Sequence, residues 1–62
     1  MQHNAIRTFE DAVEYLDGMS LETFAHQQRL DAIDLRDPLD RRAVKIALIN
    51  HARGLRDFTE QQ

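Results

Sequence analysis

The sequence contains no cysteine and no tryptophan, and among its 62 residues only one proline and two glycines. Without cysteine, disulfide bonds and thiolate metal sites are excluded, and the composition fits a reducing compartment. Two separated glycines, Gly18 and Gly54, cannot build a glycine-rich phosphate loop or a dinucleotide-binding fingerprint. Few helix-breaking residues remain, so most of the chain is free to form helices.

Long apolar runs are also missing: no segment approaches the 18 or so consecutive apolar residues of a membrane span, and the N-terminal residues lack the basic and apolar regions of a signal peptide. We therefore expect a cytoplasmic protein that does not contact a membrane. Its length predicts a single small helical domain over residues 1–62. A chain of this size buries only about 60% of its unfolded surface, so additional burial in a homodimer or against a partner is expected.

The most strongly patterned segment runs from residue 37 to 58. Asp37 is a good N-cap, Pro38 takes the first helical position, where its missing N–H costs nothing, and Asp40 at the third position can act as a capping-box acid. At 100° per residue, one arc of about 80° predicts the buried face of this helix. The residues of this arc are Val44, Ala47, Leu48, His51, Leu55 and Phe58.

The other side of the same predicted helix carries Leu39, Ile46 and Ile49 among basic residues. These bases are Arg41, Arg42, Lys45, Arg53 and Arg56. Two interpretations remain open. The bases can form a solvated face whose aliphatic stems cover the apolar residues, or exposed aliphatic side chains rimmed by arginine can form a binding surface.

Two shorter helices precede this segment. Thr8 and Asp11 form a capping-box-like pair, Gly18 ends the first helix, and Ser20 caps the second. The end of the second helix is open between residues 28 and 34. The prediction is an all-α domain with three helices at about 8–17, 20–33 and 38–57, with flexible segments at 1–7 and 59–62.

No group of residues carries a recognisable catalytic or metal-binding pattern. His3, His26 and His51 lack a second histidine one helical turn away, and the Glu22 and His26 pair is typical of an ordinary helix surface. His51 lies on the apolar arc, where a core histidine, with pH-sensitive packing as the alternative, is expected. We therefore predict no catalytic residue, no metal, no cofactor and no enzymatic activity.

The net charge of −3 conceals an asymmetry. Residues 1–40 hold nine acids and three bases, whereas residues 41–62 hold five bases and two acids. The acidic and basic parts can pair with each other within the fold, between two copies, or with a charged partner. A helix-turn-helix-like DNA-binding regulator is one alternative, with Arg41, Arg42 and Lys45 at the start of the third helix contacting DNA. Asp37 and Asp40 count against it because they would face phosphates.

The leading prediction is a small acidic protein-interaction module that acts as a regulator, adaptor or inhibitor of a larger protein of unknown identity. A homodimer is expected, and a structural or assembly subunit is a further alternative. The predicted protein-binding residues are Leu39, Arg42, Lys45, Ile46, Ile49 and Arg53.

Overall fold

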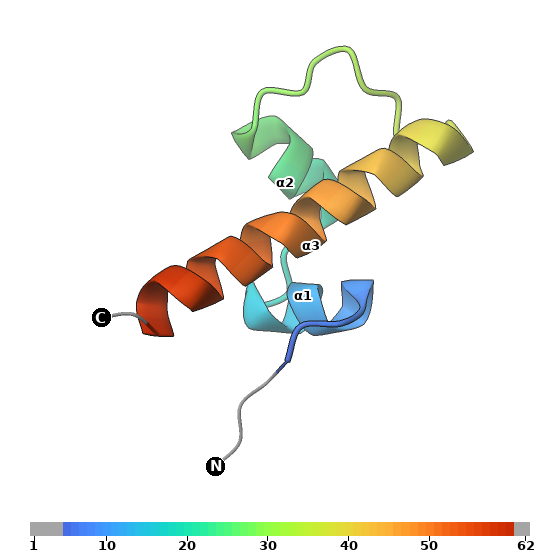
Figure 1. Ribbon diagram of the computed structural model, residues 1–62. Coiled ribbons are helices and arrows are strands. Elements are labelled where there is room, and N and C mark those ends of the chain that lie inside the picture. The colour runs from blue at the N-terminus through green and yellow to red at the C-terminus, as the bar shows by residue number, and fades with distance from the viewer. Residues whose placement is uncertain (1–4, 61–62) are drawn as a thin grey trace.

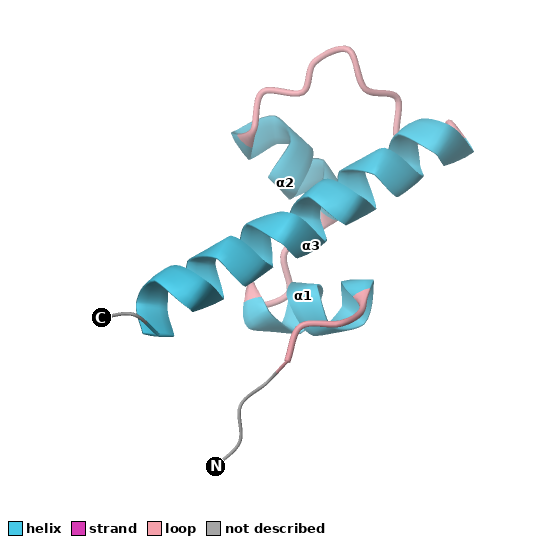
Figure 2. Ribbon diagram, in the orientation of Figure 1, coloured by secondary structure: helices cyan, strands magenta, loops and turns pink. Residues whose placement is uncertain are grey.

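The computed structural model describes residues 5–60, which form three helices and no strand (Figure 2). They are α1 (Phe9–Tyr15), α2 (Leu21–Gln27) and α3 (Pro38–Glu60). The predicted all-α class with a long C-terminal helix is thereby confirmed. Each helix differs from its predicted range by one or more residues at one end or both, and the second differs most.

Helix α3 is the longest element of the molecule, and the other two helices pack on it. Its 23 residues span about 34 Å at 1.5 Å per residue, close to the longest dimension of the molecule, 38 Å. Helices α1 and α2 both pack against α3, and the connection between them passes behind it in the view of Figure 1. The side of α3 that faces the viewer is not covered by either short helix.

The core lies between α3 and the two short helices. Val44, Leu48 and Ala52 supply it from α3 at four-residue intervals, which places them along one line of the helix. Opposite them lie the buried residues Ile6, Ala12, Leu21, Phe24 and Ala25. No polar or charged residue is buried among the described residues, so this core is apolar.

Helix α1 begins as its sequence predicts. The Thr8 hydroxyl accepts a 3.1 Å hydrogen bond from the Asp11 N–H, and the Asp11 carboxylate accepts from the Thr8 N–H at 3.3 Å. The helix ends two residues before the predicted residue 17. Asp17 adopts a φ of 63° and Gly18 a φ of 81°, and the Gly18 N–H bonds to the Val13 carbonyl at 2.8 Å. This is a Schellman ending, with an aspartate in the left-handed position that usually holds glycine.

Helix α2 ends at Gln27, so the prediction of a helix to residue 33 was wrong. Arg29 takes a left-handed φ of 59°. The Arg29 N–H bonds to the His26 carbonyl at 3.1 Å and the Leu30 N–H to the Ala25 carbonyl at 3.0 Å. These two bonds close a second Schellman motif and turn the chain away from the helix axis. Residues 30, 33 and 35 then follow as half-buried leucine and isoleucine side chains packed on the core.

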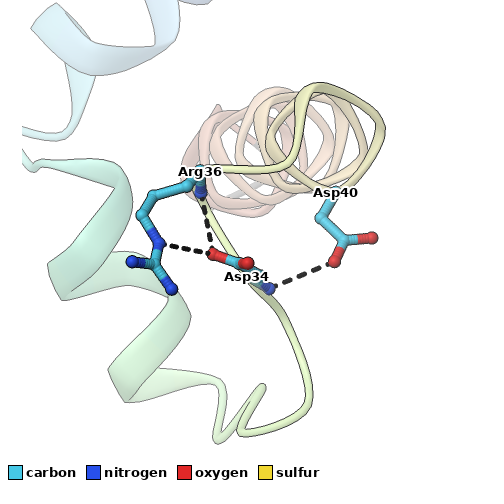
Figure 3. Close-up of polar contacts among 3 residues, drawn as sticks. All are labelled: Asp34, Arg36 and Asp40. Carbon is cyan, nitrogen blue, oxygen red and sulfur yellow. Dashed lines mark hydrogen bonds and ion pairs between the residues drawn. The ribbon is translucent and has the colours of Figure 1, made fainter.

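The connection that follows is fastened to the start of α3 by polar contacts (Figure 3). The Asp40 carboxylate accepts a 3.1 Å hydrogen bond from the Asp34 N–H, rather than from the backbone of Asp37 as a capping box requires. The Asp34 carboxylate in turn accepts from the Arg36 N–H at 3.0 Å and from Arg36 Nε at 3.2 Å. The acid at the third helical position therefore holds a residue six positions earlier and closes the loop.

The predicted flexible segments fall partly outside the described residues, which exclude 1–4 and 61–62. Within the described part, Ile6 is 3% exposed and belongs to the core, while Thr59 and Glu60 belong to α3. Flexibility of 1–7 and 59–62 stays a prediction.

Among residues 5–60, none of the helices is both long enough and apolar enough to cross a membrane.

Candidate protein-binding surface

The side of α3 that α1 and α2 leave uncovered exposes large aliphatic side chains, and the exposed Asp57 lies in line with Leu39 toward its C-terminal end. We call this side the open face and define it by five exposed residues within an arc of about 80°: Leu39, Ala43, Ile46, Asn50 and Gly54. Leu39 is 76% exposed and Ile46 is 49% exposed, although both are large aliphatic residues. Leaving such side chains in water sacrifices about 1.5–3 kcal/mol for each one that could be buried.

The basic residues near this face have different surroundings. Arg42 is exposed at its border and forms no ion pair within the described part of the chain. The Lys45 ammonium lies over the Phe9 ring of α1, 5.1 Å from its centroid, in a cation–π contact. Arg53 donates a 2.8 Å hydrogen bond from Nε to the Ile6 carbonyl. Lys45 and Arg53 are therefore engaged by α1 and the segment before it.

The six residues predicted to bind protein thus divide into two groups. Leu39, Arg42 and Ile46 lie together on or beside the open face. Ile49 is half-buried and packs against the core. It lies, with Lys45 and Arg53, along the border that α3 shares with α1 and the N-terminal segment.

Two residues expected in the core are exposed. Leu55 is 41% and Phe58 is 64% exposed, although they continue the arc of Val44 and Leu48. The periodicity placed them on the correct side of α3, but α1 and α2 are only seven residues long each and do not extend over its last turns (Figure 1). The prediction that both are buried was wrong for this reason.

The residues predicted to contact DNA also differ in their surroundings. Arg41 and Arg42 are exposed on the first turns of α3, whereas Lys45 is held over Phe9. The connection between α2 and α3 runs from residue 28 to 37, ten residues instead of the three or four of a helix-turn-helix. It is also fastened by Asp34 and Asp40, so acids lie beside the basic turn.

The histidines and acids do not converge. His26 is exposed on α2, His51 packs its ring against Phe24 with centroids 5.4 Å apart, and His3 lies outside the described residues. Within residues 5–60, no three histidine, aspartate or glutamate side chains are grouped to hold a metal ion. The shifted carboxyl is Asp11, where the Arg7 N–H at 3.1 Å, followed by the Thr8 contacts, holds the pKa below its ordinary value of 3.8. These bonds explain Asp11 as a cap.

Sequence reasoning missed the small residues of the open face, Ala43, Asn50 and Gly54. A signal was present, because a glycine inside a helix, as at position 54, costs about 1 kcal/mol relative to alanine. A Cβ added at Gly54 would meet no atom within 4 Å. Nothing inside the monomer therefore requires a glycine at this position.

We compared the chain with protein-family models, with curated proteins and with solved structures. No match was found in any of the three comparisons.

Proposed function

We propose that this protein is a non-enzymatic interaction module of the cytoplasm, which regulates, adapts or inhibits a larger protein by binding it through the open face of α3. The observation that carries the proposal is the exposure of Leu39 and Ile46 on the open face, with Arg42 at its border. Surfaces that combine aliphatic residues with a bordering arginine are typical of protein contacts.

The geometry of a single long helix supports this mode of binding. An uncovered face along 23 residues offers a row of side chains at three- and four-residue spacing, which is how one helix is recognised by another or by a groove. Homodimerisation is part of the same proposal, because a second copy can cover the same residues.

The experiment is site-specific photocrosslinking in the native cell. A photoreactive residue at Ile46 should give discrete protein adducts, and one at Glu22, exposed on α2, should not. A probe at residue 43, also on the open face, should give the same adducts, and Leu39→Asp in that chain should abolish them. Equal labelling from both positions, or no adduct from the open face, would contradict the proposal.

DNA binding through Arg41 and Arg42 is the alternative that their exposure favours. It requires an affinity for duplex DNA that falls steeply with salt, by about one power of ten or more between 50 and 200 mM. Titration of a labelled duplex at low salt, with Arg42→Ala as the variant, distinguishes it from protein binding. An assembly subunit is the other alternative, and it predicts oligomers that grow with concentration.

A further inference from the structure

A strip along one edge of the open face has a pattern of side-chain size that reads the same in both directions. It includes the half-buried Ala47, which also packs on the core, and Phe58 at the uncovered end of α3, and Ile46 lies just outside it. Large residues stand at its two ends, Leu39 and Phe58, and four small or short residues lie between them: Ala43, Ala47, Asn50 and Gly54. The spacings are four, four, three, four and four residues. At 100° per residue all six fall within an arc of about 100°, which is one continuous strip of helix surface.

A strip with this symmetry is complementary to itself when two copies run antiparallel. Residue 39 of one copy then lies level with residue 58 of the other, 43 with 54, and 47 with 50. Small residues meet at the centre, where the two helix axes can approach closely, and the large residues lie further out, where crossing helices diverge. The spacing of four belongs to the packing class with a crossing angle of about 50°.

Charge selects the same orientation. Arg42 and Asp57 border the strip on one side, near its opposite ends. Arg56 Nε and Nη2 both bond to Oδ1 of Asp57, at 3.4 and 3.1 Å, and the Asp57 side chain is 60% exposed. In an antiparallel pair the same borders of the two strips meet, so Arg42 of each copy lies near Asp57 of the other. In a parallel pair each border faces the opposite border of the partner, and Arg42 and Asp57 do not meet across the contact.

Gly54 supplies independent support. Its exposed position inside a helix is unfavourable, and no atom of the same molecule approaches it. Close approach of another backbone is one reason for glycine at such a site. Phe58, 64% exposed in the monomer, gains cover from the same contact.

We infer that the open face of α3 is closed by a second copy of this chain, in an antiparallel α3–α3 contact that pairs Ala43 with Gly54, Ala47 with Asn50 and Leu39 with Phe58. The inference rests on the proposed function because it names the partner of the same surface. A single helix pair forms an interface at the small end of the range for specific contacts, so a dissociation constant of about 1–100 µM is expected.

Sedimentation equilibrium is the first test. Wild-type protein should change from monomer to dimer over that concentration range. Gly54→Leu should weaken the dimer at least tenfold while raising the thermal stability of the monomer, since leucine is the better helix former. Thr59→Leu, exposed on the opposite side of α3, is the control and should leave the dimer unchanged. A wild-type monomer at all concentrations, or an unchanged Gly54→Leu dimer, overturns the inference.

Because the chain has no cysteine, disulfide trapping can test the orientation. Ala43→Cys and Gly54→Cys chains of different mass, mixed and oxidised, should give predominantly the mixed 43–54 disulfide. A predominance of 43–43 and 54–54 products would indicate a parallel pair and contradict the proposed orientation. Failure here leaves binding of a heterologous protein untouched, because the photocrosslinking at residue 46 tests that independently.

Discussion

Arg53 of α3 donates a 2.8 Å hydrogen bond from Nε to the backbone carbonyl of Ile6, 47 residues earlier in the chain. The bond holds the segment before α1 against α3, and the Ile6 side chain is buried in the core. The guanidinium of Arg53, beside the open face, is thereby directed toward the segment before α1.

Replacing this arginine should loosen the N-terminal segment. Arg53→Met keeps much of the aliphatic stem and removes the donor, so we expect the free energy of unfolding to fall by about 1 kcal/mol. Amide exchange of the residues next to Ile6 should accelerate. Arg42→Met is the matched control, and it should change stability by less than about 0.5 kcal/mol, since Arg42 has no partner within the described chain. Urea unfolding of dilute protein measures both, and equal losses would contradict the role given to the bond.

Replacing the left-handed residue that follows α2 should stabilise the protein, whereas Arg53→Met destabilises it. Arg29 has a φ of 59°, where a side chain is unfavourable and glycine is not. We expect Arg29→Gly to stabilise the protein by about 0.5–1 kcal/mol. Gln28→Gly, one residue earlier at a φ of −88°, should instead be neutral or destabilising. Thermal unfolding of the two variants checks the contrast, and a loss of stability in Arg29→Gly would show that this helix end is wrongly described.

Acid should weaken the α1 cap. The bonds from the Arg7 and Thr8 N–H groups lower the pKa of Asp11 below 3.8 in the folded state. A lowered pKa means that the stabilisation is complete above pH 3.8 and is lost as the pH falls through the folded value. The difference in unfolding free energy between wild type and Asp11→Asn should therefore be constant near neutral pH and shrink below about pH 4. Denaturation at a series of pH values measures it. A difference that grows on acidification has the wrong sign for this cap.

Truncating a buried phenylalanine and an exposed one should change the free energy of unfolding by different amounts. Phe24 is 2% exposed, and Phe24→Ala should cost about 3–5 kcal/mol, enough to unfold a domain of this size. Phe58 is 64% exposed, and Phe58→Ala should cost less than about 1 kcal/mol in the monomer. Circular dichroism during urea titration of dilute samples compares them. A large loss from Phe58→Ala would mean that the end of α3 is covered within one chain.

Local chemistry made much of the fold predictable from the sequence. Thr8 with Asp11, and Ser20, mark two helix starts, and in the structure each hydroxyl accepts from a backbone N–H three residues on. Pro38 marks the third start, and α3 begins there. The end of α2 was not predictable, because arginine at position 29 gives no turn signal. In the structure, the half-buried side chains at residues 30, 33 and 35 pack on the core after this turn.

The candidate surface was predictable only in part, because periodicity gives the direction of a side chain but not what covers it. Leu39 and Ile46 were assigned to the uncovered side and are exposed. Ile49 was assigned to the same side, but it is half-buried and packs on the core. The contacts of Lys45 with Phe9 and of Arg53 with Ile6 join distant parts of the chain. No sequence spacing reveals such pairs.

The most direct test of the open face as a contact surface is the concentration dependence of the amide NMR spectrum between about 10 µM and 1 mM. The two glycine signals report separately, since Gly54 lies on the open face and Gly18 lies at the end of α1. We predict that the Gly54 signal, together with Ala43 and Ile46, shifts with concentration while Gly18 stays fixed. Spectra that do not change with concentration, or shifts confined to α1 and α2, would contradict the account.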